Sequence, residues 1–244
     1  MSVRLDRLLA NLGYGTRREV QALVRAGRAA LDGANLADAE TKIALAPDLP
    51  QRLRIDGAPL DPLPGLVVML HKPAGVTCSR QEAGPLVYGL LPARWQRREP
   101  PLSSAGRLDK DTSGLLLLTD DGALLHKLIS PRAQIPKRYL ATLARPLRGD
   151  EAAAFASGTM MLKGEDRPLL AADFEAVAPA AARVAIFEGR YHQVRRMFAA
   201  LGNHVEALHR ESIGGLALPG DLAAGSFRVL ERGAADLALA AVLA

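Results

Sequence analysis

The sequence predicts an α+β fold, in which a small helical module precedes a larger domain that contains buried strands. The chain has 244 residues, a length that suits one large domain with a small appendage. Leucines near the start recur with the spacing of one helical face, and short apolar runs further along are typical of buried strands. Hydrophobic residues make up 49% of the chain, which is enough to build a packed core.

Two short helices are expected at the front of the chain. A helical spacing joins the buried leucines of the first helix, namely Leu5, Leu8, Leu9 and Leu12. The second helix is expected to begin after Thr16, because Thr16 and Glu19 have the spacing of a capping box. Val20, Leu23 and Val24 provide its buried side. Turns between short apolar segments are predicted at Asp32-Gly33 and Asp56-Gly57.

A proline-rich segment divides the chain into two parts. Pro59, Pro62 and Pro64 lie close together, and proline removes backbone donors and stiffens the chain. We therefore place the domain boundary here. The predicted parts are an N-terminal domain over residues 1–58, a linker over residues 59–64 and a main domain over residues 65–244.

The N-terminal module carries a surplus of arginines. The whole chain has a formal charge of +5 and a pI of about 9.6, a balance that favours an anionic partner, most often nucleic acid. Short helices with arginines on their outer surface suit contacts with phosphate, although charge alone is also compatible with a solvated face. The arginines predicted to bind RNA are Arg4, Arg17, Arg18, Arg25 and Arg28.

Three features predict a soluble cytoplasmic protein that does not enter a membrane. Cys78 is the only cysteine, so no internal disulfide can form, which fits a reducing compartment. Charged residues at the N-terminus exclude the apolar core of a signal peptide. The longest apolar runs are too short to span a bilayer.

The most informative stretch of the main domain surrounds Asp109. The run from Leu66 to Leu70 is expected to form a strand that ends in a turn from His71 to Gly75. The run from Leu115 to Leu118 is expected to form a strand buried on both faces, and Asp109 lies in the polar loop before it. A loop braced by a buried strand holds a reactive group rigidly.

The residues alone leave three interpretations of Asp109. Aspartate beside threonine, serine and glycine is most often a turn or capping residue. A calcium-binding loop would need a glutamate at its twelfth position and a helix on either side, whereas Leu115 to Leu118 is predicted to be a strand. The third interpretation is a catalytic carboxylate.

Several long segments resemble one family of RNA-modifying enzymes. The segment GRLDKDTSGLLLLTDDG around Asp109 resembles the signature of the RsuA-type pseudouridine synthases, the RsuA/RluB/RluE/RluF family. Further blocks that occur in the order of that family are KPAGVTCS, KRYLATL and EGRYHQVRRMFAALGNHVEALHRESIGGL. At the front, RLDRLLANLGYGTRREVQALVRAGRAALDG resembles an S4-type RNA-binding domain. Because the similarity spans essentially the whole chain, it favours the catalytic interpretation of Asp109.

The resemblance implies a set of roles. Asp109 matches the catalytic aspartate, and Tyr139 matches a tyrosine that stacks on the target uracil. Arg195 matches a basic residue that pairs with the aspartate, and Leu208 matches an apolar residue beside the base. The family isomerises a flipped-out uridine to pseudouridine without a cofactor or a metal. Its catalytic domain has a mixed, largely antiparallel sheet crossed by the active-site cleft.

Helical geometry distinguishes the two adjacent arginines, Arg195 and Arg196. The buried stripe of their helix is expected to consist of Val194, Met197, Phe198 and Leu201. Arg195 flanks this stripe, so we expect it to keep Asp109 ionised, whereas Arg196 points away and is expected to contact RNA phosphate. The alternative is that both arginines face solvent. Further predicted phosphate ligands near the pocket are Arg107, Lys110, Lys137, Arg138, Arg190 and Arg210.

The similarity is greatest to the branch that acts on small-subunit 16S rRNA. The expected partner is therefore rRNA, either free or in a small-subunit assembly intermediate, bound by a monomer. The alternatives are a 23S rRNA enzyme of the same family and a non-catalytic rRNA-binding or assembly factor. Asp109 is expected to act either as a nucleophile at C1′ of the ribose or as a base that removes a ribose proton. His192, His204 and His209 lack the spacing of metal ligands and are expected to contact RNA or pack.

Overall fold

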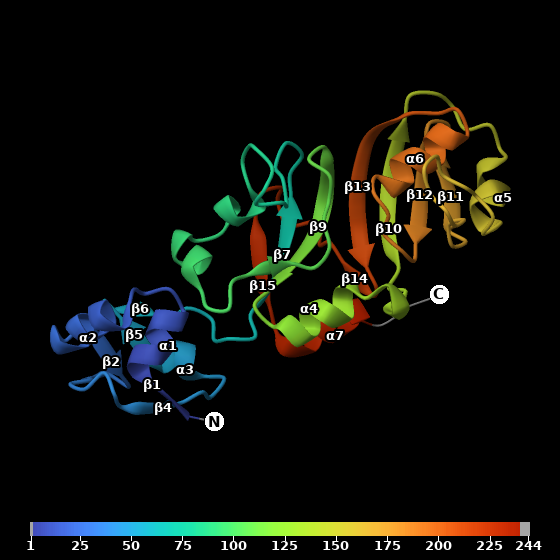
Figure 1. Cartoon of the computed structure of the whole chain (residues 1–244). Helices are drawn as coiled ribbons and strands as arrows, with labels where there is room; N and C mark the ends of the chain where they lie inside the picture. The colour runs from blue at the N-terminus through green and yellow to red at the C-terminus, as the bar shows by residue number, and fades with distance from the viewer. Residues whose placement is uncertain (1, 240–244) are drawn as a thin grey trace. The chain divides into compact units, whose positions relative to one another are not determined.

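The computed structural model describes residues 2–239, and these residues separate into two compact units (Figure 1). One unit contains the chain up to Leu66 together with Leu91–Ser103 and Thr119–Gly122. The other contains Val67–Leu90, Ser104–Leu118 and the chain from Ala123 onward. The first break follows Leu66, just after the predicted linker, and two later segments also join the N-terminal unit. The predicted division into residues 1–58, 59–64 and 65–244 stays a prediction.

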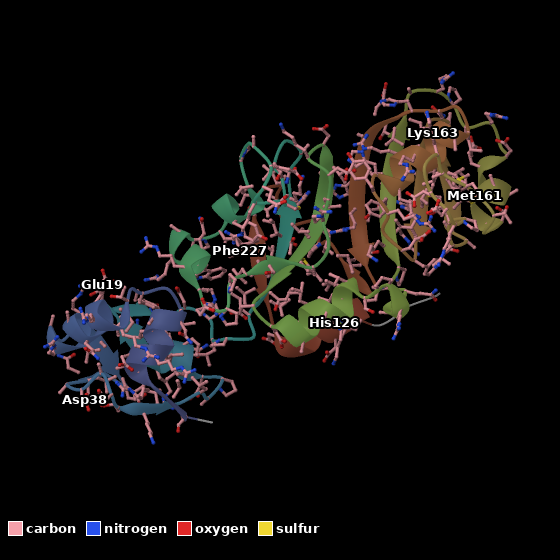
Figure 2. The ribbon with its side chains drawn as sticks, in the orientation of Figure 1. Glu19, Asp38, His126, Met161, Lys163 and Phe227 are labelled. Carbon is pink, nitrogen blue, oxygen red and sulfur yellow. The ribbon has the colours of Figure 1, made fainter. Side chains whose placement is uncertain are left out.

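The N-terminal unit begins with two short helices that pack on a small sheet. Helix α1 spans Leu5–Asn11 and α2 spans Arg17–Arg25, and the leucines predicted for the first helix are all buried. Thr16 and Glu19, the latter labelled in Figure 2, form the predicted capping box at the start of α2. The remaining elements are β1 (Ser2–Arg4), β2 (Ala29–Leu31), β3 (Ala34–Asn35), β4 (Lys42–Ala44), α3 (Leu49–Arg52), β5 (Leu53–Ile55) and β6 (Ala58–Pro59).

Two tight hairpins shape the four-stranded sheet of this unit, which has the order β3-β2-β5-β6. Asp32-Gly33 connects β2 to β3, and Asp56-Gly57 connects β5 to β6. All four residues have positive φ, between 51° and 83°. Asp-Gly pairs tolerate this left-handed conformation, so both predicted turns are confirmed.

A buried ion pair joins the later segments to the N-terminal unit. Arg98 and Asp120 are in contact at 2.7 Å, with side chains only 1% and 2% exposed. Arg98 also donates to the carbonyls of Pro62 and Leu63, and Asp120 accepts from the backbone of Gly65. The proline-rich segment is therefore held by side chains from distant parts of the sequence.

The second unit is built on a nine-stranded sheet with the main order β11-β12-β10-β13-β9-β7-β15. The strands are β7 (Val67–Lys72), β8 (Ser103–Ser104), β9 (Thr112–Thr119), β10 (Lys137–Leu143), β11 (Asp173–Ala178), β12 (Ala181–Ile186), β13 (Val205–Ile213), β14 (Leu216–Ala217) and β15 (Phe227–Leu230). The pairing of β9 with β13 is parallel, whereas β10 pairs with β12 and β13 in the antiparallel direction. The predicted α+β class and the mixed, largely antiparallel sheet are confirmed.

Helices cover parts of this sheet. They are α4 (Gly122–Ile129), α5 (Glu151–Ala156), α6 (Gln193–Ala200) and α7 (Arg232–Leu239), with 3-10 turns η1 (Val87–Leu90) and η3 (Pro131–Ala133) in the same unit; the 3-10 turn η2 (Ala93–Arg97) belongs to the N-terminal unit. Helices α4 and α7 lie side by side in Figure 1 and contribute Leu128 and Ala238 to one hydrophobic cluster. No helix within residues 2–239 is long and apolar enough to cross a membrane.

The strand predicted from Leu66 to Leu70 is displaced along the sequence. Strand β7 starts at Val67 and continues through His71 and Lys72, which were expected to lie in a turn. The strand continues because the backbone of His71 donates to the carbonyl of Ser226 and accepts from the amide of Gly225, which extends the pairing of β7 with β15. The run from Leu115 to Leu118 lies within β9 and is buried on both faces, as predicted.

Candidate active site

A cleft of about 220 Å³ opens in the second unit beside Asp109. Its walls come from segments that are far apart in the sequence: the loop before β9, the end of α4, the strands β10 and β13, and the turn that leads into α6. The residues assigned to the site or to phosphate from the sequence that line it are Arg107, Asp109, Lys137, Tyr139, Arg190, Leu208 and Arg210. Arg195 and Arg196 belong to α6 but do not line the cleft.

Strand register explains why these side chains meet. Tyr139 on β10 is opposite Arg210 on β13, and Arg210 is opposite Gly114 on β9. Paired residues in neighbouring strands point to the same face of a sheet, and so do residues two apart in one strand. A Cβ on Gly114 would collide with the backbone of Arg210, so glycine is required where these strands approach each other.

Lys72 holds the loop that carries Asp109. Its side chain is fully buried, and its ammonium group donates to the carbonyls of Pro73, Lys110 and Thr112 at 3.0, 3.1 and 2.7 Å. Two of these carbonyls lie just after Asp109 in the sequence. Burial lowers the pKa of Lys72, partly offset by the charges of Asp109 and Asp111, which favour the cation. This lysine lies in the segment KPAGVTCS, but no role was predicted for it from the sequence.

Asp109 is partly exposed, with 31% of its side chain accessible, and two groups from the α6 region approach it. Arg195 Nε lies 3.9 Å from Asp109 Oδ2, and His192 Nε2 lies 3.4 Å from Oδ1. Arg195 also donates to the carbonyls of Val205 and Asp111, which orient its guanidinium. The expected proximity of Arg195 and Asp109 is thus observed, but as a loose contact at the rim.

His192 was not assigned to the site from the sequence. It adopts a left-handed conformation, with φ of 48°, at the N-cap of α6. Its ring stacks on that of Tyr191 at 3.8 Å between centroids, and Tyr191 is 74% exposed. The segment EGRYHQVRRM contains His192, but its histidines were considered only as metal ligands, RNA contacts or packing residues. Nothing in the spacing indicated that the backbone would turn this ring toward Asp109.

Three polar side chains cluster at the inner end of the cleft. Arg210 is 1% exposed and donates from Nε to the carbonyl of Leu115 at 2.7 Å and from Nη1 to the hydroxyl of Tyr139 at 3.3 Å. Its guanidinium also lies 5.9 Å from the centre of the Tyr139 ring. Burial, and the charge of Arg210 nearby, lower the pKa of Lys137 to about 8. The guanidinium of Arg210 is therefore held inside the wall of the cleft, and the phosphate contact expected for it from the sequence stays a prediction.

Arg190 and Arg196 are tied into a local network. Arg196 contacts Glu165 at 2.7 Å and donates to the carbonyls of Lys163 and Tyr191; Lys163 is labelled in Figure 2. Arg190 contacts Glu165 and Glu188. The phosphate role expected for Arg196 gains no support from this geometry. Arg195 and Arg196 are also similarly exposed, at 21% and 25%, so their expected difference in burial is small.

The arginines predicted to bind RNA in the N-terminal unit fall into two groups. Arg4 contacts Asp6 and Glu40, and Arg28 contacts Asp56 at 2.6 Å. The remaining arginines of the set, Arg17, Arg18 and Arg25, are exposed and form no ion pair with any residue within 2–239. Their RNA-binding role stays a prediction.

No group of three or more histidine, cysteine, aspartate or glutamate residues within 2–239 is arranged to hold a metal ion. Two carboxylates line the cleft, Asp109 and Glu188. Glu188 accepts hydrogen bonds from the backbone of Leu170, from Arg190 and from Gln193. Among the described residues 2–239, the side chain of Asp109 has the looser contacts with His192 and Arg195, and 31% of it is accessible.

Comparison with known proteins identifies the family. Residues 66–200 match the family described as RNA pseudouridylate synthase. The ribosomal small subunit pseudouridine synthase A of Escherichia coli strain K12 is 41% identical over 93% of this chain and 96% of its own length. The Yersinia pestis enzyme of that name is 42% identical over 93% of this chain and 94% of its own.

A solved structure supports the same assignment. The crystal structure of a pseudouridylate synthase matches 97% of this chain and 99% of its own, with 35% identity and a TM-score of 0.67. The chain therefore belongs to the RNA pseudouridylate synthase family, and it is an isomerase that acts on RNA.

Proposed function

We propose that this chain is an rRNA pseudouridine synthase that isomerises a specific uridine of 16S rRNA, with Asp109 as the reacting carboxylate. The observation that carries the assignment of Asp109 is the contrast between the two carboxylates of the cleft. Glu188 is engaged by three donors, whereas the partly exposed Asp109 has looser contacts, with His192 at 3.4 Å and Arg195 at 3.9 Å. The names of the relatives from Escherichia coli and Yersinia pestis support a small-subunit substrate.

One carboxylate suffices for this reaction. The bond from C1′ of the ribose to N1 of uracil breaks, the base turns, and a bond from C1′ to C5 forms while C5 loses its proton and N1 gains one. No water is consumed, so the second carboxylate that a glycoside hydrolase uses to activate water is unnecessary. Asp109 can act by attacking C1′ or by removing a ribose proton.

The other cleft residues suit the remaining requirements. The target nucleotide must leave its stack, at a cost of a few kcal/mol that contacts in the pocket offset. Tyr139 lines the cleft, and we expect its ring to stack on the base, an interaction of roughly 1–3 kcal/mol. Leu208 adds an apolar wall, and Arg195 steadies the charge of Asp109. Arg107 is exposed at the rim of the cleft, where phosphate is accessible to it.

Release of tritium from RNA labelled at C5 of uridine tests the proposal, because the C5 hydrogen leaves when the new bond forms. Purified protein is incubated with unmodified 16S and 23S rRNA transcripts and with small-subunit assembly particles. We expect about one release per 16S molecule, in free RNA or in particles, and none from 23S rRNA. Release from 23S rRNA alone would reassign the substrate, and RNA binding without any release would favour an assembly factor.

The Asp109→Asn variant tests the carboxylate. It is expected to bind 16S rRNA with nearly normal affinity and to lower the rate by at least about 10⁴-fold, since removal of a reacting group has effects of this size. Glu188→Gln is the matched control and should retain far more activity. Turnover by Asp109→Asn close to that of the wild type would contradict the assignment. A substrate of this kind fits the monomeric, cytoplasmic protein expected from the sequence.

A further inference from the structure

Two buried polar atoms in the cleft have no hydrogen-bond partner among residues 2–239: the hydroxyl oxygen of Thr112 and Nη2 of Arg210. Both residues are 1% exposed, and both line the Asp109 cleft. A buried polar group without a partner costs about 1–3 kcal/mol, and more when it is charged. Such groups are rare in native proteins, so two of them in the wall of one cleft indicate a ligand that completes them.

Both atoms belong to the same face of the sheet. In the parallel pairing of β9 with β13, Thr112 is opposite Leu208 and Gly114 is opposite Arg210. Thr112 is two residues before Gly114 on β9, and Arg210 is the partner of Gly114 on β13. Gly114 has no side chain that would fill the space between Thr112 and Arg210. Two of the three guanidinium nitrogens of Arg210 are fixed by Leu115 and Tyr139, which leaves Nη2 as a preoriented donor.

The chemistry of these atoms matches the Watson–Crick edge of uracil. That edge presents N3–H, a donor, between two carbonyl oxygens, O2 and O4, which are acceptors. A guanidinium nitrogen can only donate, so it requires a carbonyl, whereas a threonine hydroxyl can accept from N3–H. Enzymes that act on flipped bases read this edge by such hydrogen bonds.

The symmetry of this edge fits the reaction. Exchanging N1 for C5 at the ribose requires a half-turn of the base about the axis through N3 and C6. That rotation leaves N3–H in place and exchanges O2 with O4. A site with an acceptor for N3–H and a donor for one flanking carbonyl therefore makes the same hydrogen bonds before and after the rotation.

We propose that the Thr112 hydroxyl and Arg210 Nη2 bind the Watson–Crick edge of the target uracil and hold the base through its rotation. This assignment rests on the proposed placement of the uridine in the Asp109 cleft. It gives the buried Arg210 a contact with the base in place of the phosphate contact expected from the sequence. It also gives Thr112 a role in substrate binding.

Thr112→Val is the decisive variant, because valine keeps the shape of threonine and removes only the hydroxyl. Loss of one hydrogen bond to the base should lower kcat/KM on tritiated 16S rRNA by about five- to a hundredfold. The melting temperature should be unchanged or higher, because an unsatisfied buried hydroxyl is removed. Thr112→Ser keeps the hydroxyl and should restore most of the activity.

Ser113→Ala is the matched control on the next residue of the strand. Its hydroxyl is hydrogen-bonded to His209 Nδ1 at 2.9 Å, so its loss should affect stability and leave kcat/KM within about twofold of the wild type. Arg210→Lys keeps the charge but loses the planar guanidinium with its several N–H donors, and should lower kcat/KM at least as much as Thr112→Val. If Arg210→Lys does not fold, the two Thr112 variants still test the proposal.

Normal kcat/KM in Thr112→Val would overturn the proposal. So would a melting temperature several degrees lower, which would show that the hydroxyl has a partner within the protein. Absence of tritium release by the wild-type protein from both rRNAs is a different result, because it rejects the proposed function itself. The two proposals are separated if activity is lost in Asp109→Asn but kept in Thr112→Val. That result would support the proposed function and reject only the assignment of Thr112 and Arg210 to the base.

Discussion

Two exposed arginines of the N-terminal unit and two buried cations of the second unit are held in opposite ways. In the N-terminal unit, Arg28 and Arg52 are 54% and 44% exposed, and each contacts an aspartate of a hairpin turn. In the second unit, Lys72 and Arg210 are at most 1% exposed, and backbone carbonyls accept their hydrogen bonds. Exposed pairs contribute about 0–1 kcal/mol, whereas a buried cation is costly unless its hydrogen bonds are made. The surface arginines are therefore replaceable, and the buried cations organise the site.

Replacement of Lys72 should have the largest effect on stability. Lys72→Met leaves three buried carbonyls without their donor, so we expect a loss of about 2–4 kcal/mol in the free energy of unfolding. Activity should fall further, because Lys110 and Thr112 anchor the loop of Asp109. Urea denaturation and tritium release measure the two effects. Lys110→Met, on the exposed side of the same loop, is the control and should change stability by less than about 0.5 kcal/mol. Equal free energies of unfolding for Lys72→Met and Lys110→Met would contradict the prediction that the buried hydrogen bonds of Lys72 stabilise the fold.

The two adjacent arginines of α6 provide a sharper contrast. Arg195→Gln removes the guanidinium 3.9 Å from Asp109 and should lower kcat by about ten- to a hundredfold with little change in KM. Arg196→Gln removes a contact with Glu165 and should mainly affect stability, by about 1 kcal/mol. Steady-state kinetics on 16S rRNA separate the variants. The interpretation fails if Arg196→Gln lowers kcat as strongly as Arg195→Gln does.

Lys137 should make the stability of the protein depend on pH. Its pKa is lowered from 10.5 to about 8 by burial and by Arg210, so between these values the unfolded chain binds a proton that the folded protein does not. The free energy of unfolding should then rise from about pH 8 to about pH 10.5, by at most about 1.4 kcal/mol per pH unit. Lys137→Met and Lys137→Arg should both lack this contribution. Urea denaturation at pH 7.5 and pH 9.5 tests it, and parallel behaviour of wild type and both variants would exclude it.

The smallest effects are expected in the N-terminal unit. Replacing both Arg17 and Arg18 by glutamine should weaken binding to 16S rRNA several-fold at low salt and reduce the slope of log affinity against log salt by about 1–2, because two phosphate contacts are lost. Arg28→Gln serves as the control, since its guanidinium is already paired with Asp56. Filter binding across a salt series measures both. Identical slopes for the double variant and the wild type would contradict the RNA-binding role of this face.

Local patterns were sufficient for the parts of the fold that depend on near neighbours in the sequence. The capping box of Thr16 and Glu19 and the two Asp-Gly turns were predicted because their geometry is set within four residues or fewer. The burial of the first leucines and of Leu115 to Leu118 followed from periodicity. The end of the strand before Pro73 was misjudged, because the backbone partners of His71, Ser226 and Gly225, lie far away in the sequence.

By itself, the sequence determined the α+β class, the family and the position of Asp109 in a loop before a buried strand. Only the tertiary structure showed that His192 turns toward this carboxylate, that Arg210 is almost fully buried, and that Thr112 lines the same cleft. The physical reason is that burial and hydrogen-bond satisfaction are properties of side chains from distant segments. Strands β9, β10 and β13 bring those segments together by register, and a one-dimensional pattern does not record register between strands.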